Sequence, residues 1–249
     1  MSKNFCNIAL AKLNKKMRIT KKNLTLFACI ALIFAGCKSN KDAQLTENTE
    51  NKMKEEKQTM VLISTPYGDM KAVLYNETPQ HRDNFIKIVK QGVLDSTLFH
   101  RVIQGFMIQG GDPNSKTAKK GQMLGNGDLG YRVPAEFNDK LIHKKGALAA
   151  ARDMNPQKAS SACQFYICQG KVYTPAEIEN LQNRMGKTFS TLQRDTYTSV
   201  GGVPFLDGDY TVFGEVIEGL DVIDKIAAVK TDKNDRPLED VRMQVKIIE

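Results

Sequence analysis

Short runs of alternating apolar residues, broken by glycine and proline, fill the chain from Met60 to its end. They lie at 60–75, where two runs are joined by a turn, and at 99–103, 106–109, 146–151, 164–169, 210–216 and 242–248. Apart from residues 171–200, two stretches within this pattern have helical features: 78–92, where Thr78 is the expected N-cap and Pro79 lies in the first turn, and 219–229. Because the strands follow one another without a strand–helix–strand alternation, we predict a mainly β fold, a closed eight-stranded antiparallel barrel with two capping helices.

Residues 171–200 interrupt the strand pattern with two helix-start signals. Thr174 and Glu177 have the spacing of a capping box, with Pro175 at the first helical position, and Ser190 with Gln193 forms a second box. We therefore predict an inserted helical hairpin over 171–200. Two interpretations stay open: a purely structural insertion, or a lid or partner surface beside a functional site.

The start of the chain has the layout of a secretory leader. An apolar run of 12 residues, 24–35, follows a basic stretch and is too short to span a bilayer. The segment Ile33-Phe34-Ala35-Gly36-Cys37 resembles a bacterial lipobox, in which the cysteine is lipid-modified and becomes the new N-terminus. We expect a signal peptide over 1–36, with translation starting at Met1 or Met17, and a lipoprotein anchored through Cys37 in the bacterial cell envelope, facing the periplasm or the exterior.

Residues 38–58 are polar and charged without any period, which is typical of a disordered tether. The expected organisation is therefore a leader (1–36), a lipidated cysteine with its tether (37–58) and one folded domain (59–249). Membrane attachment is expected only through the lipid anchor.

The basic charge of the chain lies mostly in the leader. The formal net charge is +8, but seven of the 36 basic residues and none of the 28 acidic residues fall in 1–36. The remainder holds 29 basic and 28 acidic residues, so it lacks the charge excess that a nucleic-acid-binding domain retains. We expect no nucleic-acid partner.

Four ordered blocks carry a family resemblance. They are FHRVIQGFMIQGGD (99–112), GYRVPAEF (130–137), ALAAAR with CQFYI (147–152 and 163–167), and FLDG with TVFG (205–208 and 211–214). Together they resemble the cyclophilins, the barrel-fold peptidyl-prolyl cis-trans isomerases. The resemblance covers about residues 60–249 apart from the insertion, and it implies rotamase activity on proline-containing polypeptides in protein folding.

The residues also suit this chemistry directly. Rotation about a prolyl amide is slow because the nitrogen lone pair is delocalised, so a catalyst must bind the twisted amide more tightly than the planar one. Arg101 is the candidate donor to the prolyl nitrogen, since a guanidinium is always charged and has fixed N–H groups. The reaction needs neither a cofactor nor a metal, and we expect none.

The resemblance assigns the remaining roles. Phe106 and Gln109 join Arg101 as catalytic residues, with Gln109 orienting Arg101, and His100 belongs to the rim of the site or its support. Ala151 and Arg152 would offer backbone groups to the residue before proline. The substrate-binding set is His100, Met107, Ala151, Arg152, Gln164, Tyr166, Phe205, Leu206 and Tyr210.

Two function classes follow from these observations. The first is an active isomerase that assists the folding of extracytoplasmic proteins, and we expect it to act as a monomer. The alternative is a non-enzymatic module or chaperone that grips proline-containing segments. Intact Arg101 and Gln109 favour the enzyme. Cys163 and Cys168 lie five residues apart in one predicted strand, so they should face opposite ways and form no disulfide with each other.

Overall fold

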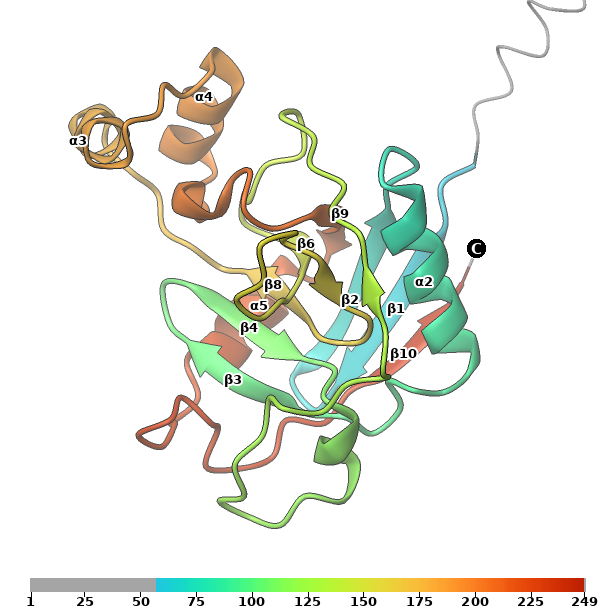
Figure 1. Cartoon of the computed structure of the whole chain (residues 1–249). Helices are drawn as coiled ribbons and strands as arrows, with labels where there is room; N and C mark the ends of the chain where they lie inside the picture. Colours follow the sequence, from blue (N-terminus) through green and yellow to red (C-terminus); the bar gives the residue numbers. More distant parts are fainter. Residues whose placement is uncertain (1–56, 249) are drawn as a thin grey trace, which may run out of the picture. The chain divides into compact units, whose positions relative to one another are not determined.

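The computed structural model describes residues 57–248 of the chain (Figure 1). The expected signal peptide, Cys37 and all but the last two residues of the expected tether lie outside the described residues. Within 57–248, each helix is too short or too polar to cross a membrane.

Eight strands form one antiparallel sheet, in the order β10-β1-β2-β9-β6-β8-β4-β3. They are β1 (Met60–Thr65), β2 (Gly68–Leu74), β3 (Phe99–Ile103), β4 (Met107–Gly110), β6 (Ala147–Ala150), β8 (Phe165–Cys168), β9 (Val212–Glu218) and β10 (Gln244–Ile247). A separate short pair joins β5 (Arg132–Val133) to β7 (Ser160–Ser161). The strand positions predicted from the apolar runs are confirmed within a few residues at each end.

The sheet curls but stays open, so the prediction of a closed barrel is wrong. β10 pairs with β1 alone, and its approach to the β3 side is limited to one isolated bridge, Leu98 to Arg242, with a few neighbouring backbone bonds. Beyond this bridge, the amide of Val102 donates to the carbonyl of Asp235, which belongs to a turn and not to a strand. Pro237 follows that turn and has no N–H for a ladder.

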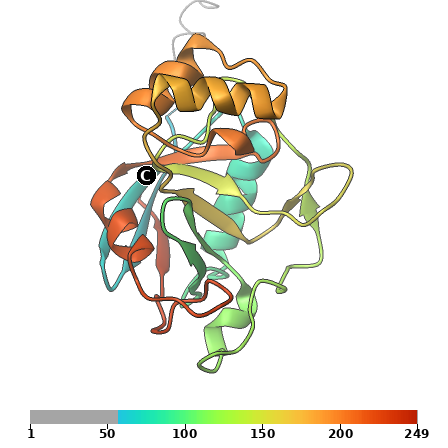
Figure 2. The ribbon, with the colours of Figure 1, turned by 90° about the vertical axis from the view of Figure 1, so that its left-hand side faces the viewer.

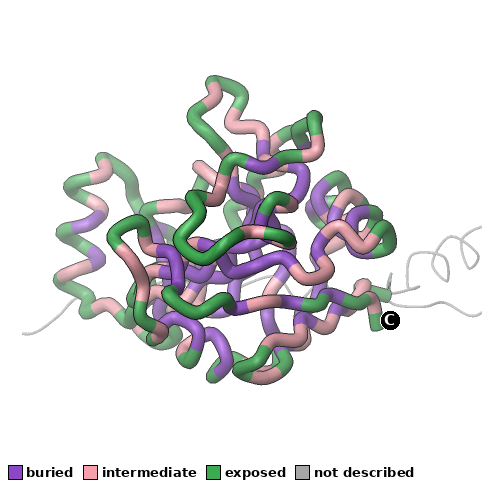
Figure 3. The backbone as a smooth tube through the Cα atoms, turned by 90° about the horizontal axis from the view of Figure 1, so that it is seen from below, coloured by how far each residue is buried: buried purple, intermediate pink, exposed green. Residues whose placement is uncertain are grey.

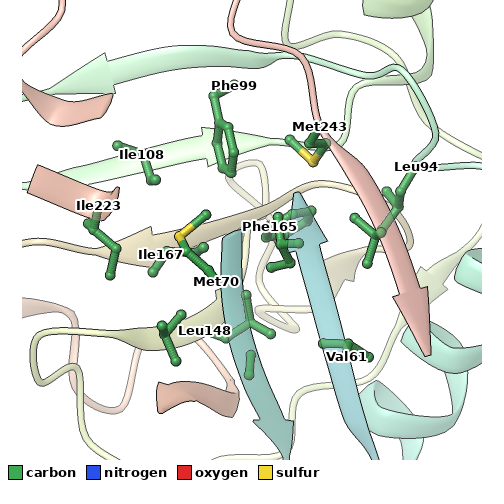
Figure 4. Packing of buried hydrophobic residues seen from close by; sticks show 14 of the residues in the cluster. Val61, Met70, Leu94, Phe99, Ile108, Leu148, Phe165, Ile167, Ile223 and Met243 are labelled. Atoms are coloured by element: carbon green, nitrogen blue, oxygen red, sulfur yellow. The ribbon is translucent and has the colours of Figure 1, made fainter. Parts of the chain in front are cut away.

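The main core fills the inside of the curled sheet. Side chains from alternate positions of the strands meet there, among them Phe99, Ile108, Leu148, Phe165 and Ile167 (Figure 4). The two predicted capping helices, α2 (Pro79–Lys90) and α5 (Leu220–Ala227), complete this core with one apolar face each. In Figure 3 the buried backbone gathers in the middle of the domain and the exposed turns surround it.

The start of α2 differs from the sequence prediction. Thr78 occupies the N-cap position, but its side chain makes no capping bond. A carboxylate distant in sequence replaces it: the two oxygens of Glu136 accept from the amides of Gln80 and His81 at 3.0 and 2.9 Å. A negative charge at this end also complements the helix dipole. The helix is therefore fixed to the 130–137 segment.

The inserted hairpin is confirmed as α3 (Pro175–Met185) and α4 (Thr191–Ser199), and both capping boxes form as predicted. Figure 2 shows the two helices (orange) beyond one end of the sheet. The hairpin has a small core of its own, made of Ile178, Leu181, Phe189, Tyr197 and, from the loop before β6, Ile142. Two short 3₁₀ helices, Pro113–Thr117 and Pro204–Leu206, complete the described elements.

Candidate active site

A second apolar cluster lies on the opposite face of the sheet from the main core. Along β8, Phe165 and Ile167 belong to the main core, whereas Tyr166 and Cys168 belong to the second cluster. β4 alternates in the same way, with Ile108 in the main core and Met107 in the second cluster. This period of two is the ordinary pleat of a strand, and it presents the predicted site residues together on one face.

Arg101 reaches the site through an irregularity in β3. Phe99 pairs with Gly110 and Arg101 pairs with Gln109, so His100 is an extra residue in the ladder. In a regular strand, Phe99 and Arg101 would share a face; here Phe99 lies in the main core and Arg101 lies at the site. The bulge separates them, as bulges commonly do where a side chain must be re-aimed.

Nine of the twelve predicted site residues line one small cavity of about 130 Å³. Its lining consists of Arg101, Phe106, Met107, Gln109, Ala151, Arg152, Tyr166, Leu206 and Tyr210. Phe205 borders the cavity from outside this lining and stacks on Phe106 with ring centroids 5.7 Å apart. The lining combines apolar surface from Phe106, Met107 and Leu206 with polar groups, among which Arg101 and Gln109 supply hydrogen-bond donors.

Gln109 and Gln164 connect the site to a glycine-rich loop. Nε2 of Gln109 donates to Oε1 of Gln164 at 3.3 Å. Nε2 of Gln164 in turn donates to the carbonyls of Gly125 and Gly127 at 2.9 and 2.7 Å. Gln164 therefore holds the Gln109 side chain. Gln109 is the cross-strand neighbour of Arg101, and its predicted role in orienting Arg101 stays a prediction.

Ala151 and Arg152 differ in how well each fits the predicted backbone contact with substrate. The amide of Ala151 donates to the carbonyl of Gln164, and its own carbonyl accepts from Ser161, so the expected backbone contact with substrate does not fit Ala151. Arg152 is held by its side chain, with Nε donating to the carbonyl of Asp209 at 2.8 Å and the guanidinium lying 4.5 Å from the Tyr210 ring centroid. The main chain of Arg152 is therefore the better candidate for the backbone contact with the residue before proline.

His100 supports the site from behind. It is 4% exposed, and within the described residues neither ring nitrogen has a hydrogen-bond partner. Burial lowers the pKa of His100 below its ordinary value, although the nearby Asp112 opposes the shift. The ring is not part of the small cavity; with Arg101 and Gln109 it borders a separate polar hollow of about 310 Å³ towards residues 121–126.

Sequence reasoning missed a buried polar network behind the site. Nδ1 of His143 donates to Oδ1 of Asp207 at 2.8 Å, because a carboxylate only accepts, and Nε2 of the same ring is hydrogen-bonded to the Tyr166 hydroxyl at 3.0 Å. Oδ2 of Asp207 accepts from the Tyr197 hydroxyl and from Gln193, both on α4. The one available signal was the Tyr at position 166, whose hydroxyl needs a partner when buried.

The two described cysteines are free and lie on different faces, as predicted. Burial raises the pKa of the Cys163 thiol to about 11, and it raises the pKa of Cys168 further. Neither is therefore a nucleophilic thiolate at neutral pH. Within 57–248, no group of three or more His, Cys, Asp or Glu residues is arranged to hold a metal ion.

Comparison with known proteins agrees with this geometry. Residues 60–247 match the family model described as cyclophilin type peptidyl-prolyl cis-trans isomerase/CLD. The chain belongs to this family of peptidyl-prolyl cis-trans isomerases. A Staphylococcus aureus protein named as such an isomerase is 34% identical over 192 residues, covering 77% of this chain and 92% of that protein.

Two further similarities concern a longer relative and a solved structure. A Streptococcus pyogenes protein named as a bifunctional phosphatase and peptidyl-prolyl cis-trans isomerase is 38% identical over 186 residues, which are 73% of this chain but only 37% of that protein. A Cryptosporidium parvum cyclophilin-type isomerase has a similar fold, with a TM-score of 0.56 and 25% identity, covering 78% of this chain and 99% of that one. The same parasite enzyme has also been solved in the presence of the dipeptide Ala-Pro.

Proposed function

We propose that this isomerase catalyses cis-trans exchange of X-Pro bonds in extracytoplasmic polypeptides, with the proline ring in the 130 Å³ cavity and Arg101 as the donor to the prolyl nitrogen. The observation that carries the proposal is the convergence of Arg101 and Gln109 with an apolar floor at one small cavity. The Ala-Pro dipeptide used with the C. parvum relative has the chemistry that such a cavity would take.

The cavity would hold one side of the bond while the other side turns. Phe106, Met107, Tyr166 and Leu206 would enclose the proline ring, and the ring would lose contact with water there. The residue before proline would lie along Arg152, where the main chain is open to it. Rotation would then move the preceding carbonyl past the polar side of the cavity.

Arg101 would lower the barrier by favouring the twisted amide. As the bond twists, the lone pair returns to the prolyl nitrogen, which then accepts a hydrogen bond that the planar amide cannot accept. An interaction made only in the transition state raises the turnover rate and not merely the affinity. Lowering the barrier by about 5–7 kcal/mol would accelerate exchange roughly 10⁴–10⁵-fold. This scheme uses no proton transfer, metal or nucleophile.

The test is exchange NMR on a short Ala-Pro peptide with the full chain, its Arg101→Ala variant and an Arg184→Ala control. Arg184 is an exposed arginine on the inserted hairpin, away from the cavity. We expect Arg101→Ala to reduce catalysis by two or more orders of magnitude, a loss of about 3 kcal/mol of transition-state stabilisation, with the control unchanged. Peptide binding without catalysis in the unmodified chain would instead establish the non-enzymatic proline-binding module.

The location outside the cytoplasm rests on the leader and on Cys37. A tether of about 20 residues gives a root-mean-square reach of roughly 25 Å, so the domain would act beside the membrane. We expect the full chain to fractionate with membranes in its native host and Cys37→Ser to release it. Cys29→Ser, in the leader, is the matched control. A Cys37→Ser variant that still pellets with membranes would contradict the lipoprotein assignment.

A further inference from the structure

A groove of about 750 Å³ runs between the inserted hairpin and the loops at the end of the sheet. One wall comes from residues 137–142, which precede β6, and the other comes from residues 187–193 at the turn between α3 and α4. In Figure 1 these segments lie beside each other, with the hairpin in orange and the loop in yellow-green. The groove is therefore created by the insertion, which the sequence left open as structural or functional.

Both walls of the groove present apolar side chains to water. Phe137 is 43% exposed on one wall, and Leu192 is 49% exposed on the other. Leu141 and Phe189 also line the groove, and Lys140 lies at its polar margin. Facing apolar side chains that rim a hollow are typical of a binding site for an apolar group.

The groove and the proline cavity are neighbours. Tyr210 lines both of them. The turn Asp207-Gly208, which lies between Leu206 and Tyr210 in sequence, lines the groove. Leu206, the residue before that turn, lines the cavity. An extended polypeptide advances by about 3.3 Å per residue, so a segment bound at the cavity can continue into the groove within a few residues.

The hairpin is held in place rather than hinged. Ile142 belongs both to the hairpin core and to the groove wall, so the loop before β6 packs against α3 and α4. Asp207 accepts from Tyr197 at 2.7 Å and from Gln193 at 2.8 Å, so α4 is bonded directly to the residue that follows Leu206. A groove with fixed walls needs little reorganisation on binding. This favours affinity for a polypeptide that is already bound at the neighbouring proline cavity.

We propose that this groove is an extended substrate subsite: it takes an apolar side chain of the same polypeptide whose proline occupies the cavity. This inference rests on the proposed isomerase function, since the cavity must bind proline. It assigns the insertion a role in substrate selection, and it makes Leu192 and Phe137 specificity-determining residues that leave the chemistry at Arg101 untouched.

The test uses peptides of serine and alanine with a single Ala-Pro bond and one leucine placed two to six residues before or after the proline. Reference peptides have serine in place of that leucine. Binding to the full chain is measured by fluorescence anisotropy, and exchange is measured by NMR on the same peptides. The variants are Leu192→Ser, Phe137→Ser on the opposite wall, and Val200→Ser as a control, since Val200 is 48% exposed on the hairpin but lies outside the groove lining.

We expect leucine at one spacing to lower Kd about tenfold, the effect of partly burying one apolar side chain. Leu192→Ser and Phe137→Ser should each remove this gain while leaving a bare Ala-Pro peptide unaffected, and Val200→Ser should retain it. The proposal is overturned if no spacing improves binding, or if both wall variants keep the gain. Leucine-dependent binding without exchange would refute the isomerase but not the groove, whereas exchange without a leucine effect would refute only the groove.

Discussion

The hydroxyl of Tyr166 lies 3.0 Å from Nε2 of His143, and this contact links the floor of the proline cavity to the inserted hairpin. On its other side, His143 donates to Asp207, which in turn accepts from Tyr197 of α4. The amide of His143 also donates to Asp207 at 2.9 Å. All these groups are largely shielded from water, so each depends on its neighbours for hydrogen bonds.

Removing one donor from this network should loosen the hairpin. Tyr197→Phe deletes the hydroxyl that donates to Asp207 and keeps the packing of a fully buried ring. We expect the free energy of unfolding to fall by about 1.5–3 kcal/mol, because the lost bond was made to a charged group. Urea unfolding measures this loss. Tyr173→Phe is the matched control, since its ring packs only at the edge of the hairpin core, and an equal loss there would contradict the assignment.

The carboxylate of Asp207 should make part of the stability dependent on pH. Burial opposes its ionisation, yet the hydrogen bonds from His143 and Tyr197 lower its pKa below the ordinary 3.8. Its contribution to stability is therefore complete above about pH 3.8 and is lost as the pH falls through the lower pKa of the folded state. Asp207→Asn should be destabilised relative to the original chain at pH 6, and this difference should shrink as the pH falls towards 3.

Alternation of apolar residues and capping signals predicted most elements correctly because both act over a few residues. The capping boxes at Thr174 and Ser190 are local patterns, and they form as predicted. Thr78 shows the limit of such reasoning. It stands at the right position, but Glu136, 55 residues or more away from the amides that it caps, supplies the bonds instead.

The geometry of the site could not be predicted from the spacing of residues along the sequence. The bulge at His100 decides where Arg101 points, and it depends on how β3 pairs with β4. The open edge between β3 and β10 similarly depends on a turn around Asp235 that interrupts the ladder. Family resemblance placed the residues of the cavity together. It gave no sign that Asp207 accepts from Tyr197 and Gln193, because these two residues belong to the insertion.

An ion pair beside the site should matter little to turnover. Nε of Arg101 lies 3.6 Å from Oδ2 of Asp235, and the two side chains are 41% and 42% exposed. Exposed pairs contribute at most about 1 kcal/mol, a factor of about five in rate. Asp235→Asn should therefore change kcat/KM by less than about fivefold, and asparagine tolerates the left-handed backbone at this position (φ 62°). A hundredfold loss in exchange NMR would show that Asp235 positions Arg101.

Buried histidines should make the fold less stable in mild acid while leaving catalysis insensitive to pH above neutrality. Burial lowers the pKa of both His81 and His100 from the ordinary 6.5, against the opposing influence of Glu136 and Asp112. The unfolded chain therefore binds more protons than the folded chain as the pH falls below about 6.5, and the free energy of unfolding drops. The slope is at most about 1.4 kcal/mol per pH unit for each histidine.

Urea unfolding at pH 7.5, 6.0 and 5.0 measures this slope, with His100→Asn as the variant. The variant should lose stability at pH 7.5 but show a shallower decline towards pH 5, because only His81 then contributes from this pair. The pH slope of the original chain should not depend on the exposed Arg184 of the inserted hairpin, so Arg184→Ala is the matched control. Identical slopes for His100→Asn and the original chain would mean that His100 is protonated equally easily in the folded and unfolded states, and the argument from its burial would be wrong.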